Sequence, residues 1–230
     1  MALRRVLVLF GRAPRAGAVK TRLEPALGAA GAVRVYREFL RDVVALPRPH
    51  ADEVVLAVAP PLDAAARAAL DPVAPAAIRR TEQRGPDLPS RLEAAFADEL
   101  ASGDAAVVVR NTDSPLLPPE REAEAFERLD DGADLVFGPD EGGGYYLVGM
   151  TRPHRGLFPG IETSSPGNLE ATLGRARTIA GRVDVLATEP DVDTPADLER
   201  LAATLAHDPG ARRRAPATAA ALRALGRAAS

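Results

Sequence analysis

A group of positively charged side chains near the N-terminus is well suited to chemistry. Residues 11–22, GRAPRAGAVKTR, contain Arg12, Arg15, Lys20 and Arg22, two glycines, one proline and no acidic residue. Positive side chains without nearby carboxylates repel one another unless an anion joins them. We therefore expect residues 11–22 to form a flexible loop that binds phosphate, the alternative being a solvated charged turn.

Carboxylates follow three later segments that we predict to be strands. Asp113 comes directly after the run 104–110, the pair Asp140-Glu141 precedes a glycine run, and Asp191 and Asp193 precede a predicted helix. Carboxylates on separate loops, completed by phosphate oxygens, are ligands that Mg²⁺ and Mn²⁺ prefer. Asp113 with Asp193 or Asp191 is thus predicted to hold Mg²⁺ or Mn²⁺. The alternative is that each aspartate is a helix cap or turn residue.

The sequence lacks the motifs that are typical of several other classes of enzymes and binding sites. Gly17 is separated from Lys20-Thr21 by two residues, so the GK[ST] of a phosphate-binding P-loop is missing, and no GxGxxG, GxSxG or HExxH motif occurs. The absence of cysteine excludes disulfides, thiolate metal sites and cysteine nucleophiles. A formal net charge of −3 argues against a nucleic-acid partner bound through bulk positive charge.

The apolar runs are short. None approaches the roughly 20 residues of a membrane span, and the N-terminal run at residues 6–10 is too short for a signal peptide. We therefore expect no membrane partner and a cytoplasmic location.

The elements that would position these loops alternate in type. Apolar runs predict strands at 6–10, 53–59, 77–82, 104–110, 133–138, 145–150 and 183–188, and periodic patterns predict helices at 28–46, 62–70, 89–100, 118–129, 169–180 and 195–206. Alternation implies one α/β domain with a mostly parallel sheet and helices on both faces. Ligands of such sheets bind beyond the carboxyl ends of the strands.

Two further segments have open interpretations. Gly142–Gly144, followed by Tyr145 and Tyr146, is either backbone close to a ligand or a hairpin turn between two strands. We assign residues 1–207 to the domain and the Ala/Arg-rich residues 208–230 to a tail or helix. A solvated tail is the simpler interpretation of that segment, and a contact in an oligomer such as a homodimer is the alternative.

Four motifs together, spread over about residues 4–205, resemble one known family. They are Arg12-Ala13-Pro14 with Gly17 and Val19-Lys20-Thr21-Arg22-Leu23; Thr112-Asp113-Ser114-Pro115; Gly138-Pro139 with Gly143-Gly144-Tyr145-Tyr146-Leu147; and Asp191-Val192-Asp193-Thr194-Pro195-Ala196-Asp197-Leu198. The family is DUF2064, also called radical-SAM/selenodomain-associated transferases of type 1. Its members are GT-A-fold proteins related to 2-phospho-L-lactate guanylyltransferase.

The resemblance implies a single-domain GT-A-like fold, as in nucleotide-diphospho-sugar transferases, and a set of site residues. The residues expected to bind the nucleotide are Gly11, Arg12, Ala13, Pro14, Gly17, Lys20, Arg22 and Asp87. Lys20, Arg22 and Asp113 are the expected catalytic residues, and Asp113, Asp193 and Asp191 the expected metal ligands. If the glycine-rich loop contacts a substrate, that substrate is the acceptor, beside Glu141, Gly143, Gly144 and Tyr145.

This sequence departs from the family pattern at several positions. Arg12 stands where Lys is usual, Asn111 where Gly is usual, Gly142 where Asp is usual, Thr163-Ser164-Ser165 where a Trp-Ser-Thr-like segment is usual, and Pro89-Ser90 where Gly-Glu is usual. Arg12 keeps the positive charge. The lost carboxylate at Gly142 and the lost aromatic side chain at Thr163 make the acceptor side less like the family, and Asp140 or Glu141 is the residue that would replace the carboxylate.

Three functions are consistent with these residues. The leading hypothesis is a metal-dependent nucleotidyltransferase that moves a nucleoside monophosphate group from a triphosphate to a small phosphorylated acceptor and releases pyrophosphate. Lys20 and Arg22 favour it, because they add more positive charge than a diphosphate with its metal requires. The alternative is a glycosyltransferase that uses a nucleotide-sugar and a hydroxyl acceptor, with Asn111-Thr112-Asp113 as a weakened Asp-x-Asp. The third is a non-catalytic nucleotide-binding protein.

Overall fold

The computed structural model of the chain describes residues 3–75, 77–101, 103–163 and 165–227. Its strands are β1 (Arg4–Gly11), β2 (Glu53–Val58), β3 (Arg79–Glu82), β4 (Ala105–Asn111), β5 (Leu135–Pro139), β6 (Tyr145–Met150) and β7 (Val183–Val185). Its α-helices are α1 (Glu24–Ala45), α2 (Ala64–Leu70), α3 (Leu88–Glu99), α4 (Pro119–Asp130), α5 (Asn168–Ile179), α6 (Pro195–His207), α7 (Pro209–Arg214) and α8 (Pro216–Ala224).

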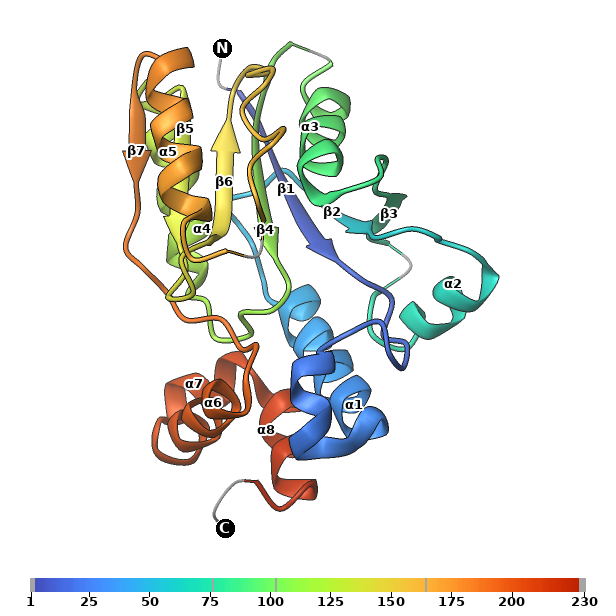
Figure 1. The fold of residues 1–230 in the computed structure, drawn as a ribbon. Helices are drawn as coiled ribbons and strands as arrows, with labels where there is room; N and C mark the ends of the chain where they lie inside the picture. Colours follow the sequence, from blue (N-terminus) through green and yellow to red (C-terminus); the bar gives the residue numbers. More distant parts are fainter. Residues whose placement is uncertain (1–2, 76, 102, 164, 228–230) are drawn as a thin grey trace.

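The strands of the described residues form one seven-stranded sheet in the order β3-β2-β1-β4-β6-β5-β7 (Figure 1). β1 is parallel to β2 and β4, β2 to β3, and β5 to β7, whereas β6 is antiparallel to both β4 and β5. The carboxyl ends of the parallel strands and the start of β6 therefore meet at one edge. The prediction of a mostly parallel α/β sheet is confirmed.

Helices cover both faces of the sheet because successive strand residues point to opposite sides. Leu7 and Leu9 of β1 belong to a core shared with α1, α2 and α4, whereas Val6 and Val8 belong to a core shared with α3 and α5. All four side chains are buried. Burial of such a side chain contributes about 1.5–3 kcal/mol, so the two cores hold the strand ends firmly in place.

The first helix begins earlier than its apolar periodicity predicted. A short 3-10 helix, Thr21–Leu23, leads directly into α1 at Glu24, and the helix breaks at Gly28, where φ is 67°. Glycine adopts this left-handed conformation without steric cost. The phosphate-binding loop predicted from the sequence therefore ends at a helix that packs on the sheet.

The interpretation of residues 208–230 as a solvated tail was wrong for their described part. Ala211, Ala219 and Leu222 are buried in a third core with α1 and α6. The carboxylate of Asp42 in α1 accepts hydrogen bonds from the backbone N–H groups of Ala217 (3.0 Å) and Thr218 (2.7 Å), at the start of α8. The small alanines allow close packing, which charge-rich composition alone did not indicate.

No helix among the described residues combines the length and apolar character needed to cross a membrane.

Candidate active site

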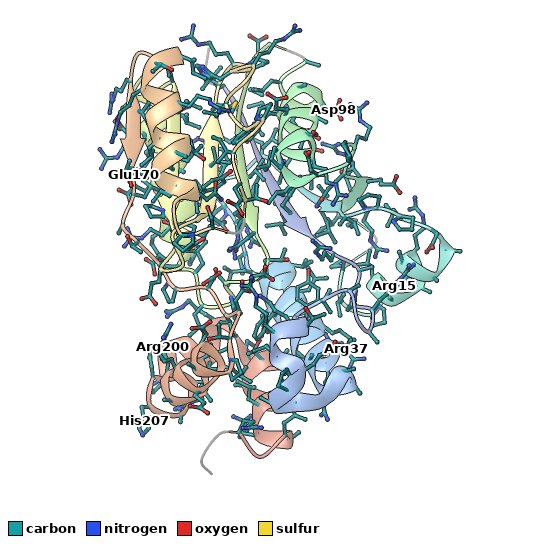
Figure 2. All side chains as sticks on the ribbon, viewed as in Figure 1. Arg15, Arg37, Asp98, Glu170, Arg200 and His207 are labelled. Atoms are coloured by element: carbon teal, nitrogen blue, oxygen red, sulfur yellow. The ribbon has the colours of Figure 1, made fainter. Side chains whose placement is uncertain are left out.

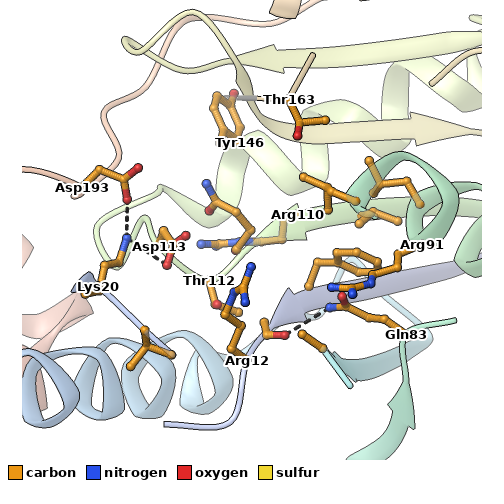
Figure 3. Close-up of a pocket in the computed structure, with 18 of the residues that line it drawn as sticks. Arg12, Lys20, Gln83, Arg91, Arg110, Thr112, Asp113, Tyr146, Thr163 and Asp193 are labelled. Atoms are coloured by element: carbon orange, nitrogen blue, oxygen red, sulfur yellow. Dashed lines mark hydrogen bonds and ion pairs between the residues drawn. The ribbon is translucent and has the colours of Figure 1, made fainter. Parts of the chain in front are cut away.

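A cleft of about 740 Å³ opens at the edge of the sheet where the parallel strands end. Its walls come from the loop after β1, the segment from β3 into α3, the end of β4 and the start of β6, with Thr163 and Asp193 at its border (Figure 3). These segments lie far apart in the sequence. The sheet brings them together, as expected for ligand sites in α/β proteins.

Lys20 joins two carboxylates at one end of the cleft. Its Nζ lies 3.0 Å from Asp113 Oδ1 and 2.7 Å from Asp193 Oδ1 (Figure 3), and its side chain is 4% exposed. Burial alone would lower the pKa of Lys20, but the two carboxylates raise it above its ordinary value, so the ammonium stays charged. Its backbone is left-handed, with φ at 47°, a strained conformation for a non-glycine residue that is frequent at functional sites.

Backbone contacts fix the two carboxylates relative to each other. Asp113 follows β4, and its carbonyl accepts a hydrogen bond from the N–H of Val192 at 3.2 Å. Asp193 precedes α6, and its own N–H donates to Asp197 Oδ2 at 3.0 Å. Thr194 is the N-cap of α6 and forms a capping box with Asp197. Both loops are therefore anchored independently of any ligand.

The other arginines of the first loop separate into two groups. Arg22 lies 3.4 Å from Asp193 Oδ2 with most of its side chain exposed, and Arg12 lines the cleft. Arg15 does not line it, because its guanidinium pairs with Asp63 beside α2 (Figure 2). Positive charge in the cleft therefore comes from both ends of the loop and not from its middle.

Two carboxylates that share one cation suit a divalent metal ion. Magnesium is usually held by one or two carboxylates and by substrate phosphates, and Asp113 with Asp193 supplies such a pair of oxygen donors. Among the described residues no group of three or more Asp, Glu or His side chains is arranged to hold a metal by itself. Nearby Asp191 has its pKa raised to about 6 by burial and by Asp193. The residues fit a metal that phosphate oxygens help to bind.

The structure brings many of the predicted site residues together and leaves others outside. Those that line the cleft are Gly11, Arg12, Gly17, Lys20, Arg22, Asp87, Asp113, Tyr145 and Asp193. Those that are not in its lining are Ala13, Pro14, Glu141, Gly143, Gly144 and Asp191.

The glycine-rich segment forms a hairpin turn between β5 and β6. Gly143 has a φ of 86°, and a Cβ there would lie 2.2 Å from the carbonyl oxygen of Pro166. The N–H of Gly144 donates to Asp140 Oδ1 at 2.8 Å, and Glu141 pairs with Arg200 at 3.1 Å. A hairpin turn explains why glycine stands at positions 143 and 144. Tyr145, the residue after Gly144, lines the cleft. Ser164, within the segment 163–165 that differs from the family pattern, lies outside the described residues.

Asp87 lines the cleft as an N-cap of α3. Its carboxylate accepts a hydrogen bond from the N–H of Ser90 at 2.9 Å, and hydrogen bonds from Ser90 lower its pKa. Its side chain therefore shapes the turn that enters α3.

Sequence reasoning missed two buried residues that hold the first loop. The Tyr36 hydroxyl accepts from the N–H of Arg12 at 2.8 Å and lies 3.0 Å from Thr112 Oγ1. The Gln83 amide donates to the carbonyls of Gly11 (3.1 Å) and Ala57 (2.9 Å). Periodicity assigned Tyr36 to an apolar helix face, and no pattern in the sequence distinguishes a hydroxyl that caps a distant loop.

Comparison with known proteins gives a family and a fold. Residues 43–165 match the DUF2064 family, described as uncharacterized proteins conserved in bacteria. A solved structure from Desulfovibrio desulfuricans G20, described as a candidate nucleotide-diphospho-sugar transferase, is 30% identical, covers 98% of this chain and 97% of its own, and has a TM-score of 0.84. No curated protein matches the sequence.

More distant structures share the fold. CMP:2-keto-3-deoxy-manno-octonic acid synthetase in complex with CTP is 17% identical over 88% of this chain and 98% of its own, with a TM-score of 0.53. 4-Diphosphocytidyl-2C-methyl-D-erythritol synthase from Anaerococcus prevotii DSM 20548 is 11% identical over 84% and 92%, with a TM-score of 0.52. These likenesses confirm the predicted GT-A-like fold.

Proposed function

This chain belongs to the DUF2064 family, and from that membership and the cleft we propose that it is a metal-dependent nucleotidyltransferase. In this proposal it moves a nucleoside monophosphate group from a nucleoside triphosphate to a small phosphorylated acceptor and releases pyrophosphate. The observation that supports it most is the contact of Lys20 with both Asp113 and Asp193 inside one cleft. Positive charge for a polyphosphate and carboxylates for a metal thus lie next to each other.

The nucleotide would lie along the first loop. Lys20 and Arg22 would bind its phosphates at one end, and Arg12 would bind them nearer the middle of the cleft. The segment from Gln83 to Asp87 would contact the base. Arg12 and Arg22 are additional positive charges beyond Lys20, and this excess favours a triphosphate over a diphosphate. These groups position the nucleotide and stabilise charge, which are the main contributions a protein makes to phosphoryl chemistry.

The acceptor would lie on the opposite wall, beside Tyr145 and Thr163. One of its phosphate oxygens would attack the α-phosphorus, and the bond from that phosphorus to the oxygen bridging the β-phosphate would break, so pyrophosphate would leave. Asp113 and Asp193, with Asp191 nearby, would hold Mg²⁺ or Mn²⁺. Such an ion, when bound, neutralises charge on the phosphates. Lys20 Nζ would donate hydrogen bonds to the leaving phosphates.

The test is a product assay. The protein is incubated with Mg²⁺ or Mn²⁺, each of ATP, GTP, CTP and UTP, and a broad panel of phosphorylated acceptors, and pyrophosphate is measured. We expect acceptor-dependent pyrophosphate with one triphosphate, and its loss in Asp113→Ala. Absence of pyrophosphate across the whole panel would contradict the proposal.

Glycosyl transfer is the second candidate, favoured by the description of the Desulfovibrio structure as a candidate nucleotide-diphospho-sugar transferase. The same carboxylates and metal would then stabilise a departing nucleoside diphosphate while an acceptor hydroxyl attacks the sugar. A panel of nucleotide-sugars distinguishes the two, because this reaction releases a nucleoside diphosphate and no pyrophosphate. Nucleotide binding without turnover in either assay would favour the non-catalytic hypothesis.

A further inference from the structure

A buried cluster of charged residues lies behind the loop that contains Asp113. Arg110, the penultimate residue of β4, is 1% exposed, and Glu122 of α4 is completely buried. Glu122 Oε1 lies 2.9 Å from an Arg110 nitrogen, and Glu122 Oε2 lies 2.9 Å from Arg48 Nε and 3.1 Å from His50 Nε2. The cluster therefore has two permanent positive charges for one carboxylate.

The guanidinium of Arg110 holds the turn after β4 at two points. Its Nε donates to the carbonyl of Asn111 at 2.7 Å, and its Nη2 donates to the carbonyl of Ser114 at 2.8 Å. Thr112 and Asp113 lie between these two carbonyls in the sequence. Because Nε, Nη1 and Nη2 all have partners within the protein, Arg110 cannot turn toward a phosphate without releasing the turn.

The side-chain oxygens at the two ends of the turn contribute no hydrogen bond to it among the described residues. The Oδ1 atom of Asn111 and the Oγ atom of Ser114 are buried and have no hydrogen-bond partner among the described residues. Arg110 gives the backbone carbonyls of both residues a charged donor, and the carbonyl of Ser114 also accepts a hydrogen bond from the N–H of Leu117 at 3.2 Å. Hydrogen bonds from a charged donor are stronger than neutral ones, so loss of Arg110 would weaken the contacts at both ends of the turn and allow it to rearrange.

We propose that Arg110 is a positioning residue, which fixes the 111–114 turn and thereby places the Asp113 carboxylate opposite Asp193. The catalytic consequence of this inference rests on the proposed function. Its structural consequence rests on the hydrogen bonds alone. Asp113 is itself partly exposed, with 38% of its side chain accessible. Its position is therefore set by its backbone more than by packing around its side chain.

Arg48 provides a matched control. It is buried, it pairs with the same carboxylate of Glu122, and its Nη1 donates to the carbonyl of Leu46 at 2.9 Å. It makes no hydrogen bond to residues 111–114 within the described chain. Arg48→Met and Arg110→Met each remove one arginine from Glu122, and Arg110→Met alone removes the donors to the turn.

The first measurement is hydrogen–deuterium exchange of the intact protein without ligands. We expect Arg110→Met to speed exchange at residues 111–114, and Arg48→Met to leave that segment unchanged while both variants lose stability to urea. If Arg110→Met does not fold, Arg110→Lys replaces it, since lysine keeps the charge but cannot donate to both carbonyls and Glu122 together. Two results would overturn the proposal whatever the reaction is. One is equal exchange at the turn in the Arg110 and Arg48 variants, and the other is exchange at the turn that stays at the wild-type rate in the Arg110 variant.

The second measurement is the affinity for Mn²⁺ with whichever of ATP, GTP, CTP and UTP the wild type binds most tightly. Residues that orient metal ligands typically contribute about 10- to 100-fold in metal affinity, and we expect such a loss in Arg110→Met but not in Arg48→Met. In an Asp113→Asn background, Arg110→Met should cause no further loss. A further loss there, or equal losses in both arginine variants, would show a general structural role. Absence of Mn²⁺-dependent binding in the wild type would instead contradict the proposed function.

Discussion

Lys20 has three properties at once that ordinary surface lysines lack. Its side chain is almost fully buried, its backbone is left-handed, and its ammonium contacts two carboxylates from distant parts of the chain. Neighbouring carboxylates raise its pKa despite burial. This combination, at the edge of a mostly parallel sheet, supports the proposed role of Lys20 in binding an anion.

We predict that Lys20→Ala weakens the binding of nucleoside triphosphate. Loss of one charge-assisted hydrogen bond corresponds to about a ten- to hundredfold change in affinity, measured by calorimetric titration. Arg15→Ala is the control, because Arg15 comes from the same loop but pairs with Asp63 outside the cleft. An unchanged affinity in Lys20→Ala, or an equal loss in Arg15→Ala, would remove the phosphate role assigned to Lys20.

At the scale of elements, α4 supplies the carboxylate on which the end of β4 depends. Glu122 is completely buried, and burial alone would raise its pKa. Hydrogen bonds with His50 and Arg110 and the charge of Arg48 reverse this effect and lower the pKa to about 2. The charged form of Glu122 therefore stabilises the connection between α4, β4 and the 111–114 turn.

The sign of this pKa shift predicts acid sensitivity. Because the pKa in the folded state is below the ordinary value of 4.5, the stabilisation is present above pH 4.5 and is lost as the pH falls toward 2. At about 1.4 kcal/mol per pH unit it amounts to roughly 3 kcal/mol. Urea unfolding of Glu122→Gln should show a loss of about 3–5 kcal/mol at pH 7. The difference from wild type should shrink between pH 4.5 and pH 2, and a constant difference would contradict the assignment.

At the scale of the whole molecule, the C-terminal helices complete the support of the first loop. α8 packs against α1, the helix into which the loop leads, and α6 begins at the cap that holds Asp193 (Figure 1). Lys20 and Asp193 thus face each other because the first and last parts of the chain share one core. Loss of that core would affect the site as well as the fold.

We predict that Leu222→Ala lowers the free energy of unfolding by about 2–5 kcal/mol, the usual cost of a cavity at a completely buried leucine. The neighbouring Arg223 is exposed, so Arg223→Ala should change it by no more than about 0.5 kcal/mol. Urea denaturation compares the two. Equal, small effects would mean that α8 does not pack against α1 in solution.

The alternation of apolar and periodic segments predicted most strands, most helices and the edge at which the site lies. It could not predict that β6 lies antiparallel between β4 and β5, because strand order depends on contacts between distant segments. The same reason explains why Tyr36 and Arg110 escaped notice. Tyr36 looks like part of an apolar helix face, and its role arises from contacts with distant loops. Arg110 looks like the end of a strand, and its role arises from backbone carbonyls, which carry no sequence signal.

In the proposed function, one cleft binds a triphosphate and a divalent metal between Lys20 and the pair Asp113 and Asp193. The most direct measurement is a calorimetric titration of wild type and Asp113→Ala with each nucleoside triphosphate, with and without Mg²⁺. We predict that Mg²⁺ strengthens binding of one triphosphate to the wild type and that this gain disappears in Asp113→Ala. Binding that does not respond to Mg²⁺, or a gain that survives in Asp113→Ala, would contradict the account.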